Sequence, residues 1–593
     1  MWHVFTLVPR TLYYYMKMNI YRPLRCLRVT AFALSLLLSA AGMAQEGKDH
    51  NFQVAKNIDI FNAIYRNLDM MYVDSLNADE VIGTGVNAML RSLDPYTVYY
   101  PASEVKDLKM MITGKYAGIG ALVRYNARLK RVVIDEPYAN TPAAEAGLKK
   151  GDVILSIDDS VTTNKDVAYV SSHLRGDPGT TFALKILRPS SGKTLTKKMT
   201  RRPIQMPAIP YYGIVEGNTG YINLNSFTEG CSKEMRRAFV DLRERGIGSL
   251  LIDLRGNGGG SLDEAVKIVN MFVPKNIMLV TTKGKLTRAN REYRTTTEPI
   301  DTDIPIVVLV NGETASASEI TAGSLQDLDR AVVLGTRTYG KGLVQTPLEL
   351  PYNANLKITT GKYFIPSGRC IQAINYKHSR GGYTEHIADS LTKVFHTSGG
   401  REVRDGGGIK PDVEVLPDSL PNIAFYLGAT GRDTTEVMFD YELDYIAAHP
   451  TIAPAREFDL SDDDYEEFKR RVIASGFSYD PETGKVLKSL KKLAQFEGYY
   501  NGAKAEFEAL EAKLKHDIGH DLDRNKEVLK SMMRADIVAA YYFQSGAIEN
   551  SIGSDKQIKE AVALLRDAER YDKILGKRGK QTAQAAFTAT NQR

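Results

Sequence analysis

Residues 304–350 read IPIVVLVNGETASASEITAGSLQDLDRAVVLGTRTYGKGLVQTPLEL, and this stretch decides the fold. Its first seven residues form a nearly continuous apolar run, which predicts a buried strand over Ile304 to Val310. A helical pattern then runs through Leu328, and further strands are predicted at Ala331 to Leu334 and Leu343 to Leu350. Strands that alternate with helices in this way predict an α/β core.

Two residues in this stretch suggest chemistry. Ser316 lies on the predicted strand-to-helix turn, and Lys341 lies on a turn flanked by glycines. A serine and a lysine so placed indicate a Ser–Lys hydrolase, in which a neutral amine replaces the usual histidine base. The interval between His173 and His378 contains no histidine, so the sequence offers no local histidine base.

Ser316 also has a purely structural explanation. With Glu319 it forms a capping box, in which serine and glutamate bond the first amides of the helix. The same helix N-terminus, however, directs a partial positive charge and the Ala317 amide toward the place where an acyl oxyanion would form. Ser318 is the rival nucleophile, but it would lie inside the first helical turn.

A glycine-rich segment, DLRGNGGG over residues 253–260, follows another predicted buried strand. Its glycines would let the amide of Gly258 or Gly259 turn inward as a second oxyanion donor. A phosphate loop and an ordinary strand–helix turn are the alternatives. No glycine–lysine–serine/threonine ending follows, which disfavours the phosphate loop.

Lys341 must be uncharged to accept the serine proton, which requires burial away from carboxylates. Residues 338–344 contain no acid, and the Gln345 side-chain oxygen is a candidate to hold the amine. An extended strand separates residues four apart by roughly 13 Å, so we expect a bend at Gly342. A solvated turn lysine is the alternative.

Residues 114–201 change to short strands around the sequence PAAEAGLKKGDVILSID, and this order closely resembles a PDZ domain. Such domains bind an extended C-terminal peptide by strand addition. The resemblance places the loop that binds the peptide carboxylate at Gly118, Ile119 and Gly120, where convergent amides would form an anion nest. A plain hairpin turn is the alternative for this loop.

The motifs together resemble the C-terminal processing peptidases, also called tail-specific proteases. TASASEI, YGKGLVQ, DLRGNGGG, TTGKYFIPSGRCIQ and GGGIKPDVEV carry the resemblance. It implies that Ser316 is the nucleophile, Lys341 the general base and Gln345 the residue that orients it. It further implies a multidomain α/β protein, with a crotonase-like α/β protease core, an inserted PDZ domain and no cofactor.

The resemblance raises two further residues. Arg175 matches an arginine that relays peptide binding to the active site in some members, and a surface arginine that caps its helix is the alternative. Asp327 matches a position implicated in some members, but pairing with Arg330 on the helix explains it equally well.

The sequence predicts five regions. They are a signal peptide with an upstream extension over 1–44, a helical N-terminal region over 45–113, a PDZ domain over 114–201, a Ser–Lys protease core over 202–415 and a helical C-terminal domain over 416–593.

The N-terminal segment indicates export. Arg22, Arg25 and Arg28 precede a short apolar run, Ala31 to Ala41, and small residues follow for cleavage. The net charge is +6, but five basic residues precede residue 45, where no acid occurs, so the remainder carries only +1. That balance leaves no basic field for nucleic acid. We therefore expect a periplasmic protein, and an association with the cell envelope stays open.

The cysteines and histidines of the chain give little evidence for a disulfide or a metal site. Cleavage near residue 44 would leave Cys231 and Cys370, and a bridge between them stays open. His516 and His520 are four apart on a predicted helix, but they lack a third ligand and the glutamate of zinc proteases, so we expect no metal.

The sequence thus predicts a secreted serine endopeptidase that recognises the C-terminal tails of proteins and cleaves them by a Ser–Lys acyl-enzyme mechanism. A non-catalytic PDZ scaffold or chaperone is the alternative. The expected partners are proteins or peptides with accessible apolar C-termini, and a homodimer and an adaptor protein stay open.

Overall fold

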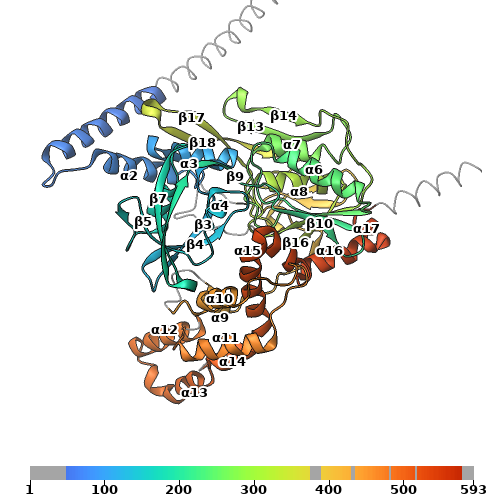
Figure 1. Cartoon of the computed structure of the whole chain (residues 1–593). Helices are drawn as coiled ribbons and strands as arrows, with labels where there is room; N and C mark the ends of the chain where they lie inside the picture. Colours follow the sequence, from blue (N-terminus) through green and yellow to red (C-terminus); the bar gives the residue numbers. More distant parts are fainter. Residues whose placement is uncertain (1–48, 374–388, 429–434, 480–481, 515–516, 577–593) are drawn as a thin grey trace, which may run out of the picture. The chain divides into compact units, whose positions relative to one another are not determined.

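The computed structural model describes residues 49–373, 389–428, 435–479, 482–514 and 517–576 (Figure 1). The chain divides into two units, 1–89 and 90–593. The predicted signal peptide and His516 lie outside the described residues. In the first unit, a helix covers residues 49–71 and α2 (Ala78–Arg91) begins. Within the described ranges, no helix has the length and apolar character needed to span a bilayer.

The protease core is built on a six-stranded sheet. The strands in the middle of this sheet, including the one before Ser316, are apolar at nearly every position because both sheet faces are covered. All neighbours pair in parallel except the first edge strand. The order is β10 (Tyr211–Val215), β11 (Thr219–Asn223), β12 (Ser249–Asp253), β15 (Ile306–Val310), β16 (Val332–Gly335) and β21 (Val413–Glu414).

Helices from two distant parts of the chain cover the two faces of this sheet. On one face Ile252 and Val308 pack with residues of α6 (Cys231–Glu244), α7 (Leu262–Val269) and α8 (Ala317–Asp327). On the other face Leu251 and Val307 pack with α16 (Lys556–Arg566) and α17 (Ala568–Ile574) (Figure 1). The helical C-terminal region therefore completes the core of the protease.

A five-stranded antiparallel sheet lies beside the turn that carries Lys341. Its β17 begins directly after Lys341 and pairs with β18, which in turn pairs with β1. β1 lies within residues 45–113, which the sequence indicated as a helical region, so that region is not helical throughout. The strands are β1 (Val98–Tyr100), β18 (Asn355–Phe364), β13 (Met278–Gly284), β14 (Arg291–Arg294) and β17 (Leu343–Glu349).

The PDZ region is an antiparallel sheet in which one of the two edge strands lies beside a helix. The edge strand β3 packs beside α5 and pairs only with β4 in this sheet. The sheet runs β3 (Ala121–Asn126), β4 (Arg131–Pro137), β5 (Val153–Ile157), β7 (Thr181–Arg188) and β8 (Lys193–Thr200), and β6 (Ser160–Val161) pairs with β5. Helices α4 (Pro142–Glu145) and α5 (Val167–Leu174) and the pair β2 (Lys115–Gly118) and β9 (Arg202–Gln205) complete it.

The C-terminal domain is helical, as expected, and one of its helices contacts the PDZ region. This helix, α10 (Val437–Ala448), packs on the PDZ sheet, where Phe439 contacts Val133 and Val153. Lys150 of the PDZ region is buried there and pairs with Glu442, 3.7 Å away. The other helices are α9 (Asn422–Gly428), α11 (Asp462–Ala474), α12 (Glu482–Phe496), α13 (Lys504–Leu514), α14 (Ile518–Arg524) and α15 (Lys526–Ile552).

The two cysteines do not form a bridge. Cys231 at the start of α6 and Cys370 after β18 are both free thiols. Burial raises the pKa of each thiol, so neither is disposed to act as a thiolate nucleophile.

Candidate active site

Ser316 occupies a strained turn between β15 and α8. Its backbone has φ 58° and ψ −116°, although it is not glycine. Such a conformation costs about 1–3 kcal/mol and persists where the surrounding structure enforces it, often at functional sites. The serine is half-buried, whereas every residue of α8 behind it is buried. A rigid helix thus holds a partly accessible hydroxyl at its N-terminus.

The buried Glu319 carboxylate joins the serine turn to the lysine turn. Its Oε2 accepts hydrogen bonds from the backbone N–H groups of Ser316 and Lys341, both at 2.9 Å. Its Oε1 accepts from the Gly340 N–H at 2.7 Å and from the Thr338 hydroxyl at 2.6 Å. The backbone nitrogens of Ser316 and Lys341 therefore lie within twice a hydrogen-bond length of each other.

A second buried side chain joins the same two residues. The Tyr363 hydroxyl lies 2.5 Å from the Lys341 carbonyl oxygen and 3.2 Å from that of Ser316, and it shares its one proton between them. Burial raises the pKa of Tyr363 well above its usual value, which keeps the phenol protonated as a donor. Glu319 and Tyr363 thus fix the amides and the carbonyls of both candidate catalytic residues.

Lys341 has the environment that a neutral amine requires. Burial, followed by repulsion from Lys357, lowers the pKa of Lys341 to about 8. Its Nζ lies 4.4 Å from the ring centroid of Tyr96. Among the described residues, no hydrogen bond joins this amine to the Ser316 hydroxyl. The structure therefore brings the two backbones together while the amine rests against an aromatic ring.

Gln345 lies near this lysine but bonds elsewhere. A β-bulge falls between Val344 and Gln345, so the chain bends two residues later than the predicted position, Gly342. The Gln345 side-chain amide donates to the Thr359 hydroxyl at 3.3 Å. Thr359 in turn bonds Thr97, which follows Tyr96. Gln345 is thus linked to the turn that carries the Tyr96 ring.

The glycine loop lies directly against Ser316. A Cβ built on Gly259 would fall 2.8 Å from Ser316 Cβ and 2.9 Å from the Ala317 nitrogen. The Gly259 N–H is already donated to the Asn257 side-chain oxygen at 2.9 Å. The amides of Ala317 and Gly258 make no hydrogen bond within the described ranges. Of the two glycine amides that the sequence offered, Gly258 is therefore the one available to an oxyanion.

Ser318 is the less suitable nucleophile. Its side chain is fully buried, and its hydroxyl donates to the Asn257 carbonyl at 2.9 Å. The Ala315 N–H bonds the same carbonyl at 3.0 Å. Ser318 therefore fastens the glycine loop to α8, as its place in the first helical turn implied.

Asp327 pairs with Arg369 and not with Arg330. The Asp327–Arg369 ion pair measures 2.8 Å, and both side chains are almost fully buried. Arg330 instead donates to backbone carbonyls, including those of Phe272 and Ile304. The expected Asp327–Arg330 pair along the helix is therefore wrong. Arg369, in the segment after β18, forms the ion pair with Asp327 instead.

Arg175 and the PDZ loop lie away from these residues. Arg175 pairs with Asp107 at 3.2 Å, and its guanidinium lies 5.3 Å from the Tyr116 ring centroid. In the loop, the Ile119 and Gly120 carbonyls accept hydrogen bonds, but their amides make none within the part of the chain that the structure describes. Those two amides are the groups that a carboxylate could use.

Sequence reasoning missed the residues that assemble the site. The sequence predicts only a capping-box role for Glu319, and it indicates no site role for Thr338, Tyr96 or Tyr363. Tyr363 stands in the quoted segment TTGKYFIPSGRCIQ, and Thr338 stands three residues before Lys341. Their roles arise from contacts between separate segments, for which a single sequence holds no signal.

We expect Gly259→Ala to lower hydrolytic activity by about 10²–10³-fold, the cost of disturbing an oxyanion hole. The added methyl would lie 2.6 Å from the Ala315 carbonyl oxygen and 2.8 Å from Ser316 Cβ, at φ +100°. Hydrolysis of an unfolded protein substrate measures the effect. Gly312→Ala is the control, because no atom lies within 4 Å of the added methyl and its φ is unstrained. Equal activity of both variants would contradict the placement of this loop.

Comparison with protein families identifies three matching segments of the chain. Residues 218–379 match the model of peptidase family S41, and residues 133–188 match a PDZ domain. Residues 429–565 match the C-terminal helical domain of a probable PDZ-protease. These matches confirm the multidomain α/β fold with a PDZ domain and a helical C-terminal region.

Solved structures also resemble the chain. A photosystem II D1 C-terminal processing protease is 26% identical, with 62% of this chain and 92% of that chain covered and a TM-score of 0.34. A putative S41 protease from Bacteroides fragilis is 18% identical, with coverage of 63% and 90% and a TM-score of 0.36. Because these TM-scores are low, the family assignment rests on sequence.

Curated relatives give that assignment. A carboxyl-terminal-processing protease of Picosynechococcus sp. is 34% identical over 285 residues, which cover 47% of this chain and 68% of the relative. A carboxy-terminal-processing protease of Bartonella bacilliformis is 35% identical over 354 residues, which cover 58% of this chain and 80% of the relative. The chain therefore belongs to peptidase family S41, the family of the carboxyl-terminal-processing serine proteases.

Proposed function

We propose that this protein is an exported serine endopeptidase that holds the C-terminal tail of a protein substrate in its PDZ domain and cleaves by a Ser–Lys mechanism. One observation carries the proposal. A single buried carboxylate, Glu319, joins the strained turn of Ser316 to the turn of Lys341, whose pKa burial lowers. That combination supplies a nucleophile and a base that can be neutral near physiological pH.

In the proposed reaction, the Lys341 side chain first turns from the Tyr96 ring to the Ser316 hydroxyl. The amine takes the hydroxyl proton while Oγ bonds to the substrate carbonyl carbon, and the oxyanion is held by the Ala317 and Gly258 amides. The resulting ammonium gives its proton to the leaving amine as the peptide C–N bond breaks. Water then attacks the ester, with Lys341 again as the base, and releases the acyl group as a carboxylate.

Activity should rise with pH through about 8, because Lys341 must lose its proton before it can act as a base. Below that pKa the amine is protonated and kcat/KM falls tenfold for each pH unit; above it the rate levels off. Lys341→Arg should lose about 10²–10⁴-fold at every pH, since a guanidinium stays protonated. Initial rates on a fluorogenic peptide between pH 6 and 10 measure both effects.

Ser316→Ala and its control Ser318→Ala test which of the two serines is the nucleophile. Only the former should abolish labelling by a serine-reactive fluorophosphonate probe, because Ser318 is buried and bonded to a carbonyl. A flat pH profile in the wild type, or an active Lys341→Arg variant, would contradict the lysine as the base.

The PDZ region supports recognition of a free C-terminus. The open edge of β3 can pair with an extended peptide beside α5, and the unbonded amides of Ile119 and Gly120 lie at its start. Leu122 on β3 is 46% exposed, which offers an apolar surface to the last residues of the tail. An apolar tail with a terminal carboxylate is the ligand that such a groove accepts. Arg175 would then act as a regulatory residue that passes the binding of this tail to the protease core.

Amidation of the substrate C-terminus should lower kcat/KM by about tenfold or more, because hydrogen bonds to a charged group contribute about 1.5–3 kcal/mol. The comparison uses one cleavable peptide core that carries either a free or an amidated apolar tail. A third peptide with the same core and a polar tail separates the carboxylate from the apolar side chains. Equal rates on the free and amidated peptides would argue against PDZ recognition.

The location is part of the proposal. The basic residues and apolar run before residue 45 support export to the periplasm, where the protein would act on envelope proteins. An adaptor protein that delivers substrates is compatible with a PDZ groove, but no contact surface for one is assigned.

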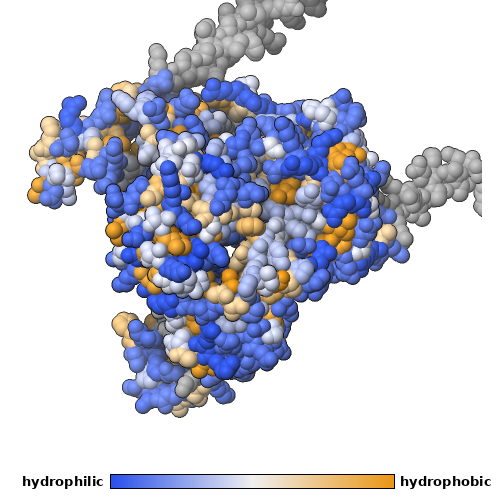
Figure 2. Space-filling view, in the orientation of Figure 1, coloured by the Kyte–Doolittle hydropathy of each residue, from blue (hydrophilic) through white to orange (hydrophobic). Residues whose placement is uncertain are grey.

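We further propose a homodimer formed through the unit 1–89. Within this unit, the helix over 49–71 exposes apolar side chains three to four residues apart, and Ile58 and Phe61 are 55% and 49% exposed. Figure 2 shows hydrophobic residues on the surface at the place of α2 in Figure 1. A stripe of this kind pairs well with an identical stripe on a second copy.

The double substitution of Ile58 and Phe61 by Glu should therefore convert the dimer to a monomer, as measured by sedimentation. Asn67→Glu is the control, because it adds a charge on the opposite side of the helix. A wild-type protein that sediments as a monomer at all concentrations tested would contradict the proposal.

A further inference from the structure

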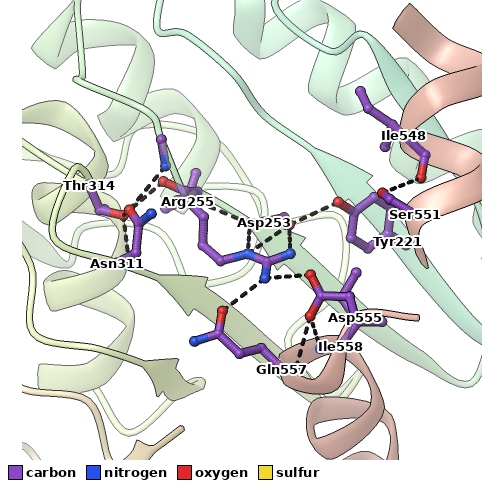
Figure 3. Close-up of polar contacts among 12 residues, drawn as sticks. Tyr221, Asp253, Arg255, Asn311, Thr314, Ile548, Ser551, Asp555, Gln557 and Ile558 are labelled. Atoms are coloured by element: carbon purple, nitrogen blue, oxygen red, sulfur yellow. Dashed lines mark hydrogen bonds and ion pairs between the residues drawn. The ribbon is translucent and has the colours of Figure 1, made fainter. Parts of the chain in front are cut away.

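Arg255 directly precedes the first glycine of the segment 253–260, whose Gly259 lies against Ser316, and its guanidinium is enclosed by polar partners. On one side it bonds Asp253 at the end of β12, with Nη2 to Oδ2 at 2.6 Å. Asp253 also accepts a hydrogen bond from the Tyr221 hydroxyl at 2.9 Å. Figure 3 shows the guanidinium between Asp253 and two residues of the helical C-terminal domain, Asp555 and Gln557.

These two residues come from a segment 300 positions further along the chain. Arg255 Nη1 donates to Asp555 Oδ2 at 2.7 Å and to Gln557 Oε1 at 2.8 Å (Figure 3). The exposed fraction of the Arg255 side chain is 19% and that of Asp555 is 25%, so solvent screens this pair only partly. The contact is thus a charge-assisted hydrogen bond in a largely enclosed place.

Asp555 uses its two oxygens for different purposes. Oδ1 accepts the Gln557 and Ile558 amides and so caps α16, whereas Oδ2 accepts from Arg255. Gln557 is buried, and its side-chain amide donates to the Val415 carbonyl at 2.5 Å. The N-terminus of α16 therefore holds Arg255 from a fixed scaffold that is also packed against the core sheet.

Arg255 is close in the chain to the candidate oxyanion donor, the Gly258 amide. Gly258 is only three residues further on, and its own amide makes no hydrogen bond within the described residues. The loop between them is short and bonded: the Gly256 N–H donates to the Asn311 side chain at 3.0 Å, and the Asn257 N–H donates to the Leu254 carbonyl at 3.2 Å. On its far side, Ser318 of α8 and Ala315 hold the Asn257 carbonyl. Arg255 holds the near end of the same segment, so the place of the Gly258 amide relative to Ser316 depends on both attachments.

We propose that Asp555 and Gln557 are positioning residues for peptide hydrolysis: they hold Arg255 and, through it, the glycine loop whose Gly258 amide stabilises the oxyanion. The helical C-terminal domain would then be a working part of the active site as well as a cover for the sheet. This inference rests on the proposed Ser–Lys mechanism, because it assigns Gly258 the role of oxyanion donor.

Asp555→Asn tests the inference with little change of shape. The amide oxygen can keep the α16 cap, while the amide nitrogen replaces Oδ2 and places a donor against the Arg255 donor. We expect kcat to fall about tenfold with KM within twofold, a fraction of the 10²–10³-fold cost of losing an oxyanion donor. Gln557→Leu removes the other acceptor without touching the cap, and a fall in kcat is expected there too.

Asp567→Asn is the matched control. Asp567 caps α17 through the Arg570 amide and makes no contact with Arg255, so this variant should keep the wild-type kcat. Each rate is divided by the active-site concentration, measured by titration with the fluorophosphonate probe. Thermal unfolding is recorded for all variants, because a purely structural role would lower the melting temperature and leave kcat per active site unchanged.

A double-mutant cycle tests the route through Arg255. In an Arg255→Gln background, Asp555→Asn should have no further effect on kcat. Additive effects, or an unchanged kcat per labelled site in both Asp555→Asn and Gln557→Leu, would overturn the inference while Ser316 is still labelled. Failure of the Ser–Lys mechanism has a different signature: probe labelling that persists in Ser316→Ala, or a flat pH profile in the wild type.

Discussion

A buried carboxylate holds the candidate active site together. Glu319 receives four hydrogen bonds from two turns, the turn of Ser316 and the turn of Lys341. Burial raises the pKa of Glu319, and the four donated hydrogen bonds oppose that shift by stabilising the carboxylate. An unpaired buried carboxylate is costly, so the two turns and the carboxylate require one another.

The same carboxylate explains how Ser316 can keep a strained backbone. Its N–H is held by Glu319 and its carbonyl by Tyr363, so the unusual φ and ψ are fixed from both sides. The Lys341 backbone is held by the same two side chains, but its amine is left to rest on the Tyr96 ring. Hydrogen bonds therefore hold the backbone of the candidate site, whereas the Lys341 amine lies against an aromatic ring.

The helical C-terminal domain links the other parts of this unit. It packs α10 on the PDZ sheet, covers one face of the core sheet with α16 and α17, and bonds Arg255 at the start of the glycine loop. A domain with three such attachments contacts both the PDZ region and the loop that lies against Ser316. Its contribution to the site could not be anticipated from its sequence, which reads as charged, solvated helices.

The sequence by itself determined the α/β core, the PDZ region and the helical C-terminal region. Continuous apolar runs such as Ile306–Val310 can be satisfied only in a strand covered on both faces, and the spacing of Ser316 and Lys341 within known motifs indicated the family. The tertiary structure decided which groups meet. In it, Asp327 forms an ion pair with Arg369, the Gly259 amide donates to the Asn257 side chain, and Arg255 donates to Asp555. The physical reason is that secondary structure follows local patterns of apolar and polar residues, whereas hydrogen bonds between distant segments depend on how the elements pack.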